Sequence, residues 1–178
     1  MRALRVVAVA AVLSLLGLLV WDVVHSHGGQ VAREVDRGRI VPAPAFSMSQ
    51  VTGAGKVSLA SLRGKVVVVN FWASDCIPCK QEQAMLNAAA RHWGGKGVVF
   101  LGIDEVDLRG PAKEYLKRYA VEYPSVYDGT GTLAGRFGVT GTPETFFIDR
   151  RGRVIPPHII ARTERADLDA GIKRALKA

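Results

Sequence analysis

Both cysteines of this 178-residue chain lie in one stretch, Asn70-Phe71-Trp72-Ala73-Ser74-Asp75-Cys76-Ile77-Pro78-Cys79-Lys80, where they are spaced Cys-x-x-Cys. The preceding run, Val66-Val67-Val68-Val69, is β-branched and continuously apolar, which is typical of a fully buried strand. The following residues, 80–90, are rich in helix formers and carry an apolar stripe at helical spacing. We therefore expect the cysteines to lie where a strand turns into the first turn of a helix.

That position has a chemical consequence. The free amide N–H groups and the positive end of the helix dipole stabilise an anion at the first turn, so a thiolate there has a lowered pKa. Spacing of i, i+3 places the second sulfur on the same face, one turn deeper. We predict that Cys76 is the nucleophile and Cys79 the resolving thiol. Pro78 suits an early helical position, because its missing N–H costs little there.

Two other interpretations of the cysteine pair are open. A zinc site needs four ligands, and only His25, His27, His92 and His158 could complete one. A passive structural disulfide is the second alternative, although it would close a very small loop. We favour redox chemistry and expect neither a metal nor a cofactor other than a redox-active Cys76–Cys79 disulfide.

The N-terminal segment resembles a targeting element. Arg2 and Arg5 precede residues 6–21, which carry no charge. This run is longer than most signal-peptide cores and slightly short for a membrane span, and we prefer an uncleaved signal anchor to a cleaved signal peptide. The predicted organisation is an anchor at residues 1–24, a linker at 25–40 and one domain at 41–178. The positive-inside rule leaves the N-terminus cytoplasmic and the domain outside the cell membrane.

The net charge of +8 and the isoelectric point near 9.9 raise nucleic acid as a partner. The basic residues are scattered, however, and no nucleic-acid motif accompanies them. We interpret the charge as a solvated surface that also suits an anionic membrane face.

The rest of the chain alternates between strand and helix patterns. A short hairpin is expected at 46–59, strands at 65–71, 98–103, 124–127 and 144–149, and helices at 111–119 and 131–137. A turn at 150–153 leads into a last strand, and a C-terminal helix follows Thr163, a plausible N-cap. This order predicts an α/β fold with a central mixed sheet flanked by helices.

The sequence resembles a known family at this point. The motif Phe71-Trp72-Ala73-Ser74-x-Cys76-x-Pro78-Cys79-Lys80, with the later Gly141-Thr142-Pro143-Glu144-Thr145-Phe146, is similar to the thioredoxin fold. More narrowly it resembles the membrane-anchored TlpA/ResA/CcmG (DsbE) type, over about residues 41 to 177. That type has an N-terminal β-hairpin extension and an insertion before the proline loop.

The resemblance implies roles for several residues. Pro143 is expected to be cis and to face Cys76, so that the main chain of Thr142 pairs with an incoming peptide. Trp72 is expected to pack beside the disulfide. A trans proline opening a strand and a plain core tryptophan are the alternatives.

Two positions depart from ordinary thioredoxin. A buried Asp six residues before the first cysteine is replaced by Asn70, and ResA-like proteins supply an acid from the end of the next strand instead. Glu105 matches that place, with Asp104 and Glu144 as rivals. The second departure is Asp75, whose charge opposes ionisation of Cys76 and makes the reduced pair a stronger reductant, unless Asp75 simply caps the helix.

The resemblance implies an extracytoplasmic protein-disulfide reductase of cytochrome c maturation, acting on the Cys-x-x-Cys-His segment of an apocytochrome. Its electrons would come from a membrane donor of the CcdA/DsbD type, and we expect a monomer. Two alternatives are a disulfide-forming oxidase or isomerase and, from a different class, a Sco-like copper metallochaperone that uses His158. A peroxiredoxin is disfavoured, because its Pro-x-x-x-Thr-x-x-Cys signature is absent.

Overall fold

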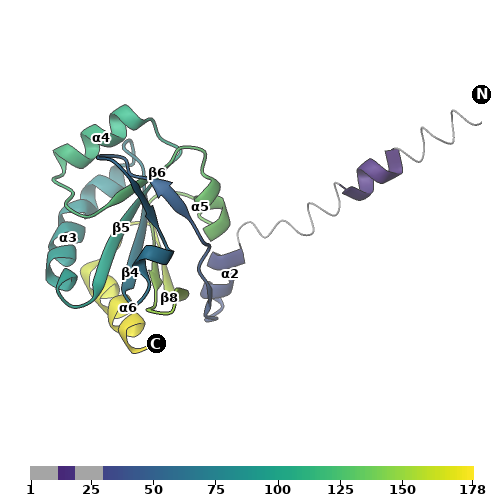
Figure 1. Ribbon diagram of the computed structural model, residues 1–178. Helices are drawn as coiled ribbons and strands as arrows, with labels where there is room; N and C mark the ends of the chain where they lie inside the picture. Colours follow the sequence, from purple (N-terminus) through teal and green to yellow (C-terminus); the bar gives the residue numbers. More distant parts are fainter. Residues whose placement is uncertain (1–11, 19–29) are drawn as a thin grey trace, which may run out of the picture.

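A six-stranded mixed sheet forms the centre of the domain, with helices on both faces (Figure 1). The computed structural model describes residues 12–18 and 30–178. The strand order is β1-β8-β7-β4-β5-β6, in which β4, β5 and β6 are parallel and the other neighbours are antiparallel. The sheet strands are β1 Val41–Pro42, β4 Val66–Trp72, β5 Val98–Glu105, β6 Ser125–Asp128, β7 Glu144–Ile148 and β8 Arg153–Ile160.

The helices and a separate hairpin cover this sheet. The hairpin pairs β2 with β3 and reaches the sheet through a bridge between Gln50 and Val126. The remaining elements are α2 Gln30–Asp36, β2 Ser47–Ser49, β3 Lys56–Ser58, η1 Ala60–Leu62, α3 Ile77–Gly94, α4 Arg109–Arg118, α5 Thr132–Phe137 and α6 Arg165–Lys177. From β2 onward the strands and α-helices follow the order expected from the sequence, and the predicted α/β mixed-sheet fold is confirmed.

The central strand β4 divides the core in two. Side chains alternate along a strand, so Val66 and Val68 pack with α3 and α6, while Val67 and Val69 pack with α2 and α5. All seven β4 residues are buried, as expected of a strand between two helical layers. A third cluster forms at the carboxyl end of β4, where Trp72 meets Cys79 and α4.

The prediction of a linker over residues 25–40 is wrong for residues 30–36. These residues form α2, whose Ala32 and Val35 are buried in the core beside α5 and β8. Val31 packs partly against the same cluster, so the apolar residues of this short helix are docked on the core. Residues 25–29, including His25 and His27, lie outside the described residues.

Thr163 is not the N-cap of the last helix. Glu164 occupies that position in α6, and Thr163 is buried, with its N–H directed to Glu82. The last strand continues through Pro156 and Pro157, whose peptide bond is cis, and its register with β7 shifts between Thr145 and Phe147.

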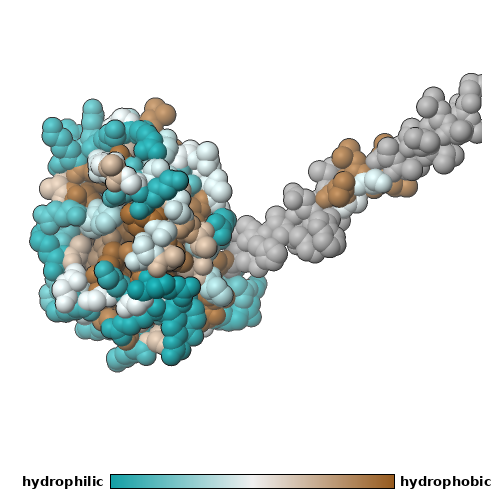
Figure 2. Space-filling view, in the orientation of Figure 1, coloured by the Kyte–Doolittle hydropathy of each residue, from teal (hydrophilic) through white to brown (hydrophobic). Residues whose placement is uncertain are grey.

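The N-terminal anchor prediction falls largely outside the described residues, since 1–11 and 19–24 are not among them. Residues 12–18 are helical, and their apolar side chains are exposed and form the brown segment between grey atoms in Figure 2. Within the described part of the chain, no helix has the length and apolarity needed to cross a bilayer.

Candidate functional site

The two cysteines form a disulfide at the junction of β4 and α3. Their Cα atoms are 5.3 Å apart. Cys76 is half-buried, whereas only 1% of Cys79 is exposed. Cys76 is therefore the more accessible cysteine of the pair, and Cys79 is enclosed by the protein.

Cys76 is itself the N-cap of α3. Its sulfur accepts a hydrogen bond from the N–H of Cys79 at 3.1 Å. Pro78 occupies the second helical position, where no intrahelical donor is needed. Free amide groups and the helix dipole thus converge on the Cys76 sulfur, the environment that stabilises a thiolate after reduction. The alternative that Asp75 caps the helix is wrong, because Cys76 holds that place.

Trp72 and α4 enclose the buried side of the disulfide. Trp72 is buried in one cluster with Cys79 and stacks on Tyr115, with ring centroids 4.4 Å apart. The Tyr115 hydroxyl shares its proton between the carbonyl oxygen of Cys79 at 3.1 Å and Oε1 of Gln83 at 3.2 Å. Gly102 leaves room for the indole, since a Cβ there would lie 2.7 Å from Trp72 Nε1. The sequence analysis placed Tyr115 in a predicted helix, at residues 111–119, and assigned it no role at the site.

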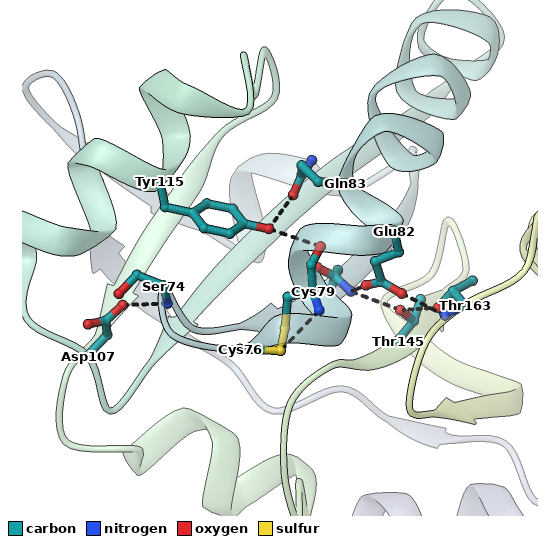
Figure 3. Close-up of a disulfide and its surroundings, with 10 residues drawn as sticks. Ser74, Cys76, Cys79, Glu82, Gln83, Asp107, Tyr115, Thr145 and Thr163 are labelled. Carbon is teal, nitrogen blue, oxygen red and sulfur yellow. Dashed lines mark hydrogen bonds between the residues drawn. A yellow bond between two sulfur atoms is a disulfide. The ribbon is translucent and has the colours of Figure 1, made fainter.

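A buried polar network lies to one side of Cys79 (Figure 3). Asn70 Nδ2 donates to Glu82 Oε1 at 2.9 Å and to Thr145 Oγ1 at 3.1 Å, and the N–H of Thr163 donates to Glu82 Oε2 at 2.6 Å. Glu82 follows Cys79 by three residues, so the two side chains lie on one face of α3. The network joins α3 to β4, β7 and the start of α6 on one side of the reactive pair.

Glu82 is the acid that the sequence analysis missed. Only 2% of it is exposed, and burial raises its pKa more than the hydrogen bonds from Thr163 and Asn70 lower it. A buried carboxyl group with a raised pKa is a stronger proton acceptor than an exposed one, which suits it to exchange a proton with a thiol on the same helix face. The sequence contains one indication that Glu82 is buried. Residue 82 continues the apolar stripe of Leu86, Ala89 and Trp93, so its side chain faces the core.

Asp104 is a second buried acid on the cysteine face. It lies opposite Trp72 in the β4–β5 register, and neighbours in register point to the same side of a sheet. The side chain is fully buried, and neither carboxyl oxygen has a hydrogen-bond partner among the described residues. Burial, together with the charge of Asp107, raises the pKa of Asp104 to about 8.

Glu105, the acid nominated from the resemblance, points to the other face. It alternates with Asp104 along β5 and follows Ile103, which belongs to the core cluster on the α2 and α5 side. Burial and the charges of Asp128 and Glu144 raise the pKa of Glu105. The structure therefore brings Glu82 and Asp104 to the cysteine face, but not Glu105.

The loop before β7 lies at the same end of the sheet as the cysteines. Glu144 pairs with Phe71 in the β4–β7 register, so Pro143 is close to the carboxyl end of β4. The Thr142–Pro143 peptide bond is cis, which is the geometry expected from the resemblance. Glu144 is buried, and the hydrogen bonds from His158 and Thr140 outweigh the effect of burial and lower its pKa.

The surface around Cys76 combines apolar side chains with a polar hollow. Ile77, Val106 and Leu108 are each about two-thirds exposed, at 65%, 67% and 72%. Asp107 fastens the loop between β5 and α4 to the cysteine loop, since its Oδ2 accepts the N–H of Ser74 at 2.7 Å. A hollow of about 320 Å³ opens beside it and is lined by Ser74, Lys80, Pro111, Glu114, Tyr115, Arg118 and Tyr119.

The metal-binding alternatives depend on histidines, of which the structure describes His92 and His158. Both ring nitrogens of His158 face carboxylate oxygens, those of Asp36 and Glu144. Among residues 12–18 and 30–178, no group of three or more His, Cys, Asp or Glu side chains is arranged to hold a metal ion.

Comparison with known proteins identifies the family. The sequence profile of the AhpC/TSA family matches residues 41–156, about two-thirds of the chain. The chain belongs to the AhpC/TSA family. The thiol:disulfide interchange protein DsbE of Pseudomonas fluorescens biotype C is 41% identical over 112 residues, which cover 62% of this chain and 61% of that protein. The thiol-disulfide oxidoreductase ResA of Bacillus thuringiensis strain Al Hakam is 30% identical over 132 residues, which cover 74% and 75%.

A solved structure agrees with these relatives. The crystal structure of a thiol:disulfide interchange protein of the thioredoxin family from Chlorobium tepidum TLS matches with a TM-score of 0.68 and 33% identity, covering 78% of this chain and 97% of that one. The predicted resemblance to ResA and DsbE, the thioredoxin fold and the class of enzyme, a thiol-disulfide oxidoreductase, are thereby confirmed.

We predict that Glu82→Gln slows disulfide exchange at pH 7 by about a hundredfold, the lower end of the range that positioned acid–base groups contribute. The buried amide cannot accept a proton from Cys79, whereas Cys76 keeps its helix N-terminus. Stopped-flow reduction of a disulfide substrate measures the rate, and alkylation by iodoacetamide measures Cys76 alone. Glu122→Gln, at an exposed carboxylate paired with Arg91, is the control. A wild-type exchange rate in Glu82→Gln would remove Glu82 from the reaction.

Asp104 predicts a pH-dependent stability. Its pKa of about 8 in the folded protein exceeds the ordinary value of 3.8, so the folded state keeps a proton that the unfolded chain releases between these values. Stability therefore falls as the pH rises from about 4 to about 8. Asp104→Asn should remove this loss and stabilise the protein by several kcal/mol at pH 8 but little at pH 4. Urea unfolding at both pH values tests this, and equal effects at the two would contradict it.

Proposed function

We propose that this protein is a membrane-anchored, extracytoplasmic reductase of protein disulfides that acts in cytochrome c maturation. The observation that carries the proposal is the asymmetry of the pair: a half-buried Cys76 whose sulfur accepts the Cys79 N–H, above a Cys79 that is buried. The relatives named DsbE and ResA support the reaction class.

The reaction begins from the dithiol form. The Cys76 thiolate attacks one sulfur of the substrate disulfide, forms a mixed disulfide and releases the other substrate sulfur as a thiolate. The Cys79 thiol, with Glu82 to take its proton, then attacks the Cys76 sulfur. This step releases the second substrate thiol and leaves the Cys76–Cys79 disulfide. Two electrons have then passed from the cysteine pair to the substrate.

The surroundings of Cys76 suit an unfolded polypeptide substrate. The exposed apolar residues Ile77, Val106 and Leu108 offer contacts to side chains next to the substrate cysteines. We propose that the main chain of Thr142, a half-buried residue next to Pro143, pairs with an extended peptide. We infer that the Cys-x-x-Cys-His segment of an apocytochrome is the substrate, bound as an extended chain across this surface.

Regeneration of the dithiol needs an outside electron source. We propose a membrane donor of the CcdA/DsbD type, which reduces the disulfide through the same exposed sulfur. The arginines before the apolar N-terminal run favour a protein that is anchored with its domain outside the membrane. Asp75, beside the nucleophile, favours reduction over disulfide formation, because its charge disfavours the thiolate.

Trapping experiments test the roles of the two cysteines. Reduced Cys79→Ser should accumulate a mixed disulfide with an oxidised apocytochrome peptide, because the resolving thiol is absent. Reduced Cys76→Ser should accumulate little, because the remaining sulfur is buried. Non-reducing electrophoresis and mass spectrometry detect the adduct, and wild-type protein should yield only reduced peptide. An adduct formed mainly by Cys76→Ser would reverse the assignment, and no adduct with either variant would exclude this substrate.

A further inference from the structure

A chain of polar contacts connects α2 to the cis-proline loop on the sheet face away from the cysteines. His158 of β8 lies at its centre, with Nδ1 3.1 Å from Asp36 Oδ1 and Nε2 2.8 Å from Glu144 Oε2. The His158 and Glu144 side chains are 2% and 1% exposed, whereas that of Asp36 is 48% exposed. The contacts therefore run from the surface end of α2 into the buried start of β7.

Glu144 binds the loop with its other oxygen. Oε1 accepts the N–H of Thr140 at 2.8 Å, the Thr140 hydroxyl at 2.8 Å and the N–H of Gly141 at 3.2 Å. These residues lead directly into the cis Thr142–Pro143 bond. One carboxylate thus fixes the main chain of the segment that precedes Pro143, and its position depends on what holds Oε2.

His158 is what holds Oε2. The imidazole ring stacks on Phe146, with centroids 4.1 Å apart and an interplanar angle of 14°, so its orientation is set by packing. Carboxylate oxygens accept hydrogen bonds and do not donate them, so the ring nitrogen facing Glu144 Oε2 is the donor of that contact. Without this ring, Oε2 would be a buried charged oxygen lacking its donor, and the carboxylate would turn toward water or another group.

We propose that His158 is a positioning residue for substrate binding: through Glu144 it holds the cis-proline loop in the form that pairs with a peptide, and Asp36 makes α2 a part of that support. This rests on the proposed function, in which the Thr142 main chain binds the substrate. The segment that leads from the N-terminal apolar run into the domain thereby contributes to the site, although it lies on the opposite face of the sheet from Cys79.

Two substitutions in the full-length protein separate this role from simple structural support. His158→Phe keeps a ring against Phe146 but removes both nitrogen contacts. Asp36→Ala removes only the half-exposed partner, so it provides a test even if His158→Phe fails to fold. Glu34→Ala is the matched control, since Glu34 lies on α2 and pairs with Arg37 and Arg39 but does not contact His158. The double variant His158→Phe/Asp36→Ala completes a double-mutant cycle, which measures the coupling between the two positions.

The readout is single-turnover reduction of an oxidised Cys-x-x-Cys-His peptide by pre-reduced enzyme. We expect His158→Phe to raise the half-saturating peptide concentration by about tenfold and Asp36→Ala by about twofold to fivefold, while the maximal rate changes far less. Asp36→Ala should add nothing in the His158→Phe background, and Glu34→Ala should resemble wild type.

The outcomes distinguish the inference from the proposed function. The positioning role would be overturned if folded His158→Phe had the half-saturating peptide concentration of the wild type. If His158→Phe does not fold, the same result for Asp36→Ala would overturn it. Either result would leave the reductase proposal intact. A fall in the maximal rate with unchanged half-saturation would also overturn it. A wild-type protein that does not reduce the peptide at all would instead reject the proposed function.

Discussion

The hydrogen bond from the Cys79 N–H to the Cys76 sulfur is the contact on which the site depends. It exists because β4 ends at Trp72 and α3 begins at Ile77, which leaves only four residues to turn the chain and makes Cys76 the N-cap. The strand can deliver the loop to that point because it is buried on both faces in the middle of the sheet. The fold thus presents one sulfur to solvent at the positive end of a helix and buries the other beneath it.

Burial changes the properties of three acids in different ways, according to their partners. Glu82 and Asp104 lie on the cysteine face, and desolvation raises the pKa of both. Glu144 is equally buried on the other face, but donors from His158 and Thr140 lower its pKa. The chain therefore places two carboxyl groups with raised pKa values on the cysteine face and one with a lowered pKa behind the cis-proline loop. Thiol-disulfide exchange moves protons at the sulfurs, which suits Glu82 and Asp104 on the cysteine face. Substrate binding needs a fixed main chain, which suits Glu144 behind the loop.

The strand, the helix and the redox pair were predictable because their signals are local: a run of four valines, a stripe of helix formers and two cysteines three residues apart. The acids were not predictable to the same degree. Whether Asp104 or Glu105 faces the cysteines depends on the phase of β5, which only its register with Trp72 fixes. Glu82 was overlooked because a charged residue in a helix is usually exposed, although its place in the apolar stripe indicated otherwise. Helix α2 was overlooked because most of its contacts come from β8 and α5, which follow it in the chain by about a hundred residues or more.

The reduction potential of the Cys76–Cys79 pair tests the central claim most directly. The full-length protein would be equilibrated with dithiol buffers at pH 7, and the thiol content determined by alkylation and mass spectrometry. Because Asp75 lies beside the nucleophile, we expect a reduction potential of about −250 mV or below, near that of thioredoxin. The potential of Asp75→Ala should be less negative. A potential near about −120 mV, like that of DsbA, would contradict the account and make this protein an oxidase.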